Sequence, residues 1–143
     1  MTSIIQSAFF PQEIIPNLFQ SGFIISPSLL ARCDFNLVID LEGGFDRGSL
    51  AKLVTAYIYW PIADGPLPDI QTLQQISLIG SFFINRKMRV LVHCFFGMNR
   101  SSLITGMIMW RLGYKGDQIV NAIKHKIPLS LTNEVFLNYL LAL

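Results

Sequence analysis

A cysteine and an arginine six positions apart are the residues of this sequence best placed to do chemistry together. Cys94 and Arg100 lie within the run His-Cys-Phe-Phe-Gly-Met-Asn-Arg-Ser at residues 93–101. An apolar stretch typical of a strand, 89–93, precedes the cysteine, and a helical pattern, 101–112, follows the arginine. A loop that ends at a helix N-terminus directs backbone N–H groups and the helix dipole at one point, which favours a bound anion such as phosphate.

Each part of this loop has a chemical reason to be there. Helix N-termini and nearby cations favour the thiolate form of a cysteine, and the thiolate is the nucleophile. The guanidinium of Arg100 can bind two phosphate oxygens at once, and Gly97 permits a backbone angle that curls the chain round a ligand. Ser101 can donate its hydroxyl to the Cys94 sulfur. The pattern predicts cleavage of phosphate monoesters through a phospho-cysteine at Cys94. The alternative is that Cys94 is a small buried apolar residue at the end of a strand.

We expect the residues between the nucleophile and the arginine to contact the substrate. Phe95 and Phe96 are bulky for a phosphate-binding loop, and we expect one to pack inward and the other to line the rim. The predicted substrate-binding residues are Phe95, Phe96, Gly97, Met98, Asn99 and Arg100.

The elements that must position this loop alternate between strands and helices. We predict one or two edge strands in 4–25, strands at 35–41, 57–61 and 89–93, and a loop at 62–68. Ser26-Pro27 is typical of a helix start, and Asp69 of the N-cap of a helix that reaches about residue 85. The other predicted helices cover residues 27–32, 101–112, 117–126 and 132–141.

This order predicts an α/β fold. We expect a central, mostly parallel sheet of four to five strands flanked by helices on both faces, with the phosphate-binding loop between a core strand and a helix. In open α/β sheets, ligands bind at the carboxyl ends of the strands.

Composition limits the other possibilities. The 143 residues, of which 52% are hydrophobic and 14% charged, suit a single domain over 1–143. The net charge of +2 is scattered, which does not favour nucleic-acid binding, and no run reaches the roughly 18 apolar residues of a membrane span. Two distant cysteines, Cys33 and Cys94, suggest a reducing compartment and offer no metal-ligand spacing. We expect a cytoplasmic monomer with no cofactor, metal or membrane partner.

The motif His-Cys-x5-Arg-Ser resembles the signature of the cysteine-based protein tyrosine phosphatase superfamily, and the short chain resembles its small dual-specificity branch. The runs at 18–22 and 35–41 and the pair Asn133-x-x-Phe136 are similar to that branch as well. The resemblance implies that Asn133 supports the phosphate-binding loop, although an ordinary helix cap is the alternative. We expect His93 to be a buried structural residue bonded to nearby backbone.

The resemblance also points to a general acid, which must protonate the leaving oxygen and later take a proton from water. Asp64 lies thirty residues before Cys94, next to Gly65, and is similar in position to the acid of the family. The alternative is that Asp64 is only a turn residue, since Asp-Gly is a common turn pair. Asp69 is the competing carboxylate, but helix capping explains it better.

The implied substrate is a protein or peptide phosphorylated on tyrosine, serine or threonine. No lysine lies between Cys94 and Arg100, whereas relatives that act on inositol lipids carry basic residues there. Asn99 before Arg100 resembles the RNA 5′-triphosphatase relatives, so that substrate class is an alternative. A phosphate-binding module without catalysis is the third possibility.

Overall fold

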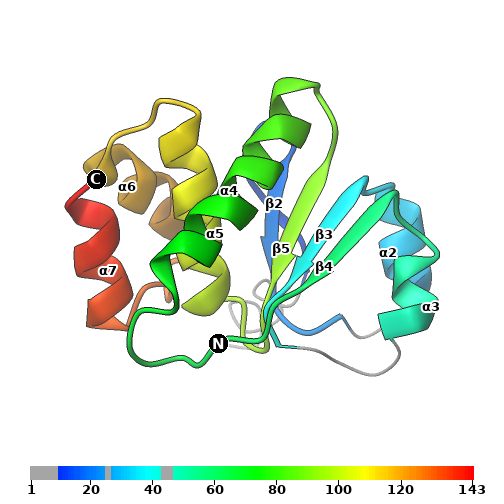
Figure 1. Cartoon of the computed structure of the whole chain (residues 1–143), viewed down its shortest axis with the longest axis horizontal. Coiled ribbons are helices and arrows are strands. Elements are labelled where there is room, and N and C mark those ends of the chain that lie inside the picture. Colours follow the sequence, from blue (N-terminus) through cyan, green and yellow to red (C-terminus); the bar gives the residue numbers. More distant parts are fainter. Residues whose placement is uncertain (1–9, 25–26, 43–46) are drawn as a thin grey trace.

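The computed structural model describes residues 10–24, 27–42 and 47–143 (Figure 1). A five-stranded sheet with the order β1-β2-β5-β3-β4 forms its centre. The strands are β1 (Gln12–Ile15), β2 (Leu18–Ser21), β3 (Leu37–Asp40), β4 (Ala56–Tyr59) and β5 (Val90–His93). Only β1 and β2 pair antiparallel, and the other three pairs are parallel. The predicted sheet is therefore confirmed.

Helices cover both faces of this sheet, as predicted (Figure 1). On one face lie α2 (Pro27–Cys33) and α3 (Arg47–Ala51), over a small apolar cluster of Leu30, Phe35, Val38, Leu50 and Leu91. The larger core lies under the helices of the other face, which are α4 (Ile70–Asn85), α5 (Arg100–Arg111), α6 (Gly116–Lys126) and α7 (Glu134–Leu141). The sequence patterns did not predict α3.

The strands next to the site are buried on both faces. All four residues of β3 and all four of β5 are buried, which explains their nearly continuous apolar sequences. Helix α5 packs directly on this sheet, and every residue from Ser101 to Met109 is buried. The loop between β5 and α5 therefore joins two of the most buried elements of the chain.

Asp69 is the N-cap of α4, as predicted. Its carboxylate accepts hydrogen bonds from the backbone N of Thr72 at 2.9 Å and from the Thr72 hydroxyl at 2.7 Å. The side-chain bond and the backbone bond both lower the pKa of Asp69 below its ordinary value. The predicted cap at Ser26 lies outside the described residues.

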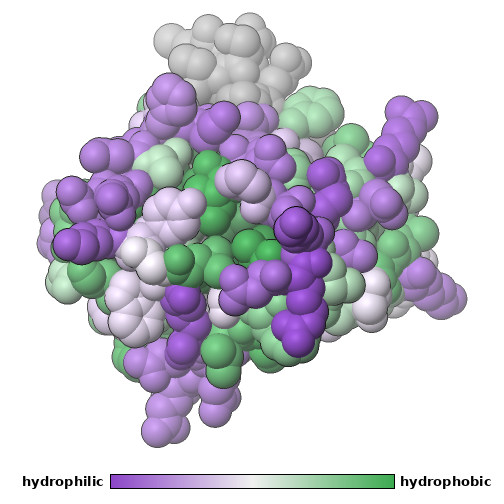
Figure 2. Space-filling model, turned by 90° about the horizontal axis from the view of Figure 1, so that it is seen from above, coloured by the Kyte–Doolittle hydropathy of each residue, from purple (hydrophilic) through white to green (hydrophobic). Residues whose placement is uncertain are grey.

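The described surface mixes polar and apolar side chains, as the view from above shows (Figure 2). Among the helices in the described part of the chain, none is long and apolar enough to cross a membrane. Within the same residues, no cluster of histidine, cysteine and carboxylate side chains could hold a metal ion.

Candidate active site

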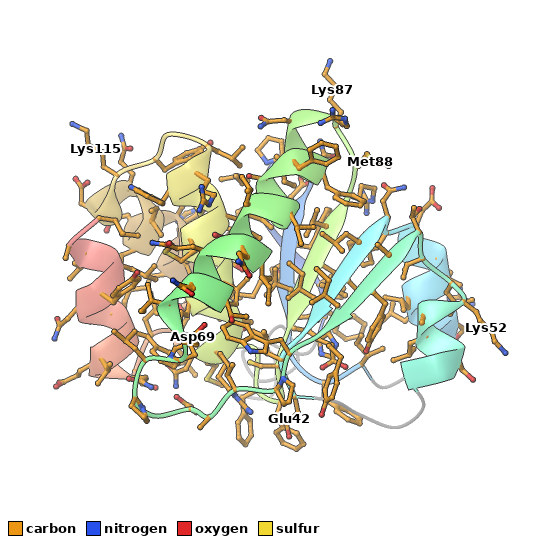
Figure 3. All side chains as sticks on the ribbon, viewed as in Figure 1. Glu42, Lys52, Asp69, Lys87, Met88 and Lys115 are labelled. Carbon is orange, nitrogen blue, oxygen red and sulfur yellow. The ribbon has the colours of Figure 1, made fainter. Side chains whose placement is uncertain are left out.

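The candidate site lies at the carboxyl ends of the parallel strands, where β5 leads into α5. Glu42, two residues beyond β3, marks this end in Figure 3, whereas Lys87 and Met88 lie at the opposite end of the sheet. A pocket of about 300 Å³ opens here. Its lining residues are Asp64, Cys94, Phe96, Met98, Asn99, Arg100 and Thr132. The loop from β5 and the predicted acid loop thus meet at one cavity.

The sulfur of Cys94 has two hydrogen-bond partners at the base of this pocket. The Cys94 thiol donates to the Ser101 hydroxyl oxygen at 3.3 Å, and the sulfur accepts from the backbone nitrogen of Gly97 at 3.3 Å. Gly97 has a φ of 72°, a left-handed angle that glycine adopts without strain. Cys94 itself is only 2% exposed. The sulfur is therefore buried and has one hydrogen-bond partner on the loop and one at the start of α5.

Arg100 begins α5, and its guanidinium is held by two groups from other elements. Its Nη1 forms an ion pair with the Glu42 carboxylate and lies 3.4 Å from the carbonyl oxygen of Ile62. The two charged side chains are partly buried, at 14% exposure for Arg100 and 33% for Glu42. Glu42 was not among the predicted site residues, although a carboxylate directly after a buried strand is a signal that could have found it.

Asp64 is held by two asparagine side chains. The Nδ2 of Asn99 donates to one carboxylate oxygen at 3.0 Å, and the Nδ2 of Asn133 donates to the other at 2.8 Å. Asn133 also donates to the Gly65 carbonyl at 3.0 Å. At the same time the Asn133 side chain caps α7 by accepting from the backbone nitrogens of Val135 and Phe136. Asn133 therefore caps a helix, and its side chain contacts the loop that contains Asp64 and Gly65.

Asn133 meets the phosphate-binding loop through its backbone. The backbone nitrogen of Asn133 donates to Oδ1 of Asn99 at 2.9 Å. The Nδ2 of Asn99 further donates to the hydroxyl oxygen of Thr132 at 3.0 Å. The predicted proximity of Asn133 to this loop is present, but the side chain that makes the contact is that of Asn99.

The two phenylalanines of the loop differ from the expectation that one packs inward. Phe95 is 41% exposed and Phe96 is 54% exposed. Phe96 lines the pocket. The ring of Phe95 contacts Phe96 edge to face and Phe23 at a tilt, with ring centroids 4.8 Å and 5.8 Å away. Because Phe95 finds apolar contacts in the rings of Phe96 and Phe23 at the surface, neither ring of the loop enters the buried core.

His93 is buried, as predicted, but a carboxylate faces its ring. Nε2 lies 3.4 Å from Oδ1 of Asp40, its register partner on β3. The hydroxyl of Tyr57 donates to the other oxygen of Asp40. Burial lowers the pKa of His93, while Asp40, the backbone of Cys94 and Glu42 act in the opposite direction. The partner that sequence reasoning missed is therefore Asp40, a charged residue at the end of an apolar strand.

The buried side chain of Gln20 forms hydrogen bonds with the loop between β5 and α5 and with the first turn of α5. Nε2 of Gln20 donates to the carbonyl oxygen of Gly97 at 3.0 Å and to the hydroxyl oxygen of Ser102 at 2.7 Å. The Ser102 hydroxyl in turn donates to the carbonyl oxygen of Met98 at 2.6 Å. Gln20 and Ser102 are fully buried, so these bonds tie the loop to β2. Neither residue was predicted, although a glutamine within an apolar strand is an unusual residue.

Solved structures share this fold over nearly the whole chain. Tk-PTP in its active form matches with a TM-score of 0.77 and 19% identity, over 93% of this chain and 97% of that one. Human DUSP28 matches with a TM-score of 0.76 and 19% identity, over 92% and 90%. DUSP15 matches with a TM-score of 0.76 and 23% identity, over 92% and 85%. At sequence identities this low, the matches show that the fold is similar and no more.

The fold and the loop after β5 define the class as the small dual-specificity branch of the protein tyrosine phosphatase superfamily, so the resemblance seen in the sequence is confirmed. The chain belongs to the cyclin-dependent kinase inhibitor 3 (CDKN3) family. The model of this family matches residues 45–122, which are more than half of the chain. No curated protein sequence matches the chain.

Proposed function

We propose that this protein hydrolyses phosphate monoesters on phosphorylated proteins, through a phospho-cysteine intermediate at Cys94. The observation that carries the proposal is the position of the Cys94 sulfur, 3.3 Å from both the Ser101 hydroxyl and the Gly97 amide, at the N-terminus of α5. A buried thiol without a chemical role does not need two polar partners and an adjoining pocket that is lined by an arginine.

In the first step, the Cys94 sulfur attacks phosphorus and forms an S–P bond while the ester P–O bond breaks. The electron pair leaves with the ester oxygen, which takes a proton from the Asp64 carboxyl group. The helix N-terminus and Arg100 bind the phosphate oxygens, whose charge they stabilise. Arginine has five N–H donors, so the contacts of Nη1 with Glu42 and Ile62 leave others for the phosphate.

In the second step, water attacks the phosphorus of the phospho-cysteine and gives a proton to Asp64. The S–P bond breaks, its electron pair returns to the sulfur, and inorganic phosphate leaves. The Ser101 hydroxyl, 3.3 Å from the sulfur, donates to the departing thiolate and makes it a better leaving group.

The lining of the pocket favours a single phosphate on a protein side chain. Among the described residues that line it, Arg100 is the only cation, and it is already paired with Glu42. Phe96 and Met98 supply the apolar part of the lining. A triphosphate or a polyphosphorylated lipid headgroup carries several charges that this pocket does not match. Tyrosine, serine and threonine phosphates each bring a single phosphate group.

The test compares purified wild-type chain with Cys94→Ser on para-nitrophenyl phosphate, phosphotyrosine and phosphothreonine peptides, and 5′-triphosphate RNA. We expect turnover of the nitrophenyl ester and the peptides, loss of turnover in Cys94→Ser, and a phosphorylated Cys94 in acid-quenched wild-type protein. Cys33→Ser, the same change at the other cysteine, is the matched control and should keep full activity. Activity in Cys94→Ser would remove the covalent mechanism. Turnover of the RNA alone would show that the substrate is a nucleic acid and not a phosphorylated protein. Phosphate binding without turnover would show that the protein is a phosphate-binding module and not an enzyme.

A further inference from the structure

Three segments far apart in the chain meet at one cluster of hydrogen bonds beside the pocket. They are the acid loop at Asp64 and Gly65, the phosphate-binding loop at Asn99, and the turn before α7 at Thr132 and Asn133. A second hollow of about 360 Å³ adjoins the main pocket and shares Asp64, Asn99 and Thr132 with it. The cluster is therefore the wall between the two hollows.

Each of the two asparagine side chains in this wall has hydrogen-bond partners for both its amide nitrogen and its amide oxygen. Those partners fit only one orientation of the amide group. Asn133 uses Nδ2 for Asp64 and Gly65, and its Oδ1 accepts from Val135 and Phe136. If this amide flipped, its oxygen would face a carboxylate and a carbonyl, and its nitrogen would face two N–H groups. The geometry consequently admits one orientation of Asn133.

The same reasoning holds for Asn99. Its Nδ2 donates to Asp64 and Thr132, and its Oδ1 accepts from the backbone nitrogen of Asn133. Asp64 itself is exposed, and the loop around it, 61–68, contains three prolines and a glycine. Among the described hydrogen bonds, only those from the two asparagine amides hold its carboxylate.

We propose that Asn99 and Asn133 are positioning residues that hold Asp64 at the mouth of the pocket, ready to protonate the leaving group. This inference rests on the proposed function, because it takes Asp64 as the acid. It differs from the role that the family resemblance implies for Asn133, which is support of the phosphate-binding loop. During proton transfer, the Asp64 oxygen that carries the proton exchanges one amide donor for the ester oxygen, and the second amide keeps the loop in place.

The two roles predict different kinetics. A residue that acts through Asp64 affects only reactions that need a proton on the leaving oxygen. Phenyl phosphate needs one, whereas para-nitrophenolate leaves readily without it. A residue that supports the phosphate-binding loop affects both substrates equally, because every substrate binds its phosphate there.

The test uses Asn133→Asp, which keeps an oxygen to cap α7 and loses the donors to Asp64 and Gly65. We expect kcat on phenyl phosphate to fall by about 10-fold or more, and kcat on para-nitrophenyl phosphate to change by less than about 3-fold. In the Asp64→Asn background the same substitution should have no further effect, because its route of action is already removed. Asn138→Asp, the same change on the exposed side of α7, is the matched control and should leave both rates unchanged.

Asn99→Ala is the second variant, in case Asn133→Asp unfolds the chain, and it should give the same dependence on the leaving group. Equal losses on both substrates, or losses that multiply with those of Asp64→Asn, would overturn the inference and assign the asparagines to the phosphate-binding loop. If Asp64→Asn itself shows no dependence on the leaving group, the assignment of Asp64 as the acid fails, and the inference with it. If Asp64→Asn shows that dependence and the asparagine variants do not, only the inference fails.

Discussion

The guanidinium of Arg100 is ion-paired with the carboxylate of Glu42, a residue that lies fifty-eight positions earlier in the chain. Glu42 lies two residues beyond β3, and Arg100 begins α5, which follows β5. Strands β3 and β5 are neighbours in the sheet. Arginine binds phosphate well only when its planar group faces the phosphate edge-on. Glu42 is therefore well placed to orient Arg100.

Glu42→Gln should lower kcat/KM by about 10-fold or more, because a misplaced guanidinium stabilises the transferring phosphate less well. The loss should be the same for phenyl and para-nitrophenyl phosphate, since Arg100 acts on phosphate oxygens and not on the leaving oxygen. Steady-state kinetics on the two esters measures this. Glu13→Gln, on β1 and outside the pocket, is the control. An unchanged kcat/KM in Glu42→Gln would show that Arg100 is oriented without it.

Asp64→Asn should reduce kcat by about 10²–10³-fold on phenyl or alkyl phosphates, the usual contribution of general acid catalysis. The loss should shrink on para-nitrophenyl phosphate, because that leaving group departs without a proton. Asp69→Asn is the matched control, and near-normal rates are expected because asparagine caps a helix about as well as aspartate. The reverse pattern, a dependence on the leaving group in Asp69→Asn alone, would exchange the two assignments.

The stability of the fold should fall as the pH drops from about 7 to about 5. Burial lowers the pKa of His93 in the folded chain, so in this range the unfolded chain binds more protons than the folded one. The neutral ring stabilises the fold above the ordinary histidine pKa of about 6.5, and this stabilisation is lost as the pH falls below that value. Urea unfolding at several pH values measures the slope. His93→Gln should flatten it, and His125→Gln, at an exposed position, should not.

Gln20→Leu should destabilise the fold by about 1–3 kcal/mol, because the Gly97 carbonyl and the Ser102 hydroxyl lose a buried donor. It should also weaken inhibition by inorganic phosphate, since the carbonyl of Gly97 belongs to the loop that binds it. Urea unfolding and phosphate inhibition provide the two readouts. Gln75→Leu, at an exposed position of α4, serves as the control for both. Normal phosphate inhibition in Gln20→Leu would limit this glutamine to a structural role.

Much of the fold could be predicted because its signals are local. Apolar runs such as those of β3 and β5 are strand signals over four residues, and the proline after β4 and the aspartate before α4 end or begin elements by their own backbone chemistry. Helix α3 was missed because it spans only five residues, too few for a helical period to stand out. The outward direction of Phe95 was missed because it depends on contact with the ring of Phe23, which lies far from it in the chain.

The sequence by itself determined the loop from Cys94 to Arg100, because a cysteine, an arginine and a helix N-terminus that lie within one short segment are adjacent in any fold. It also determined the α/β class, because segments with strand-like and helix-like apolar patterns alternate along the chain. Only the tertiary structure decided which polar residues meet that loop. Glu42 at Arg100, Gln20 at Gly97, Asp40 at His93 and the two asparagines at Asp64 are paired across distances of 35 to 77 residues. Such pairs depend on the order of the strands and on which ends of the elements converge, and a hydrogen bond requires a distance and an angle that no linear pattern encodes.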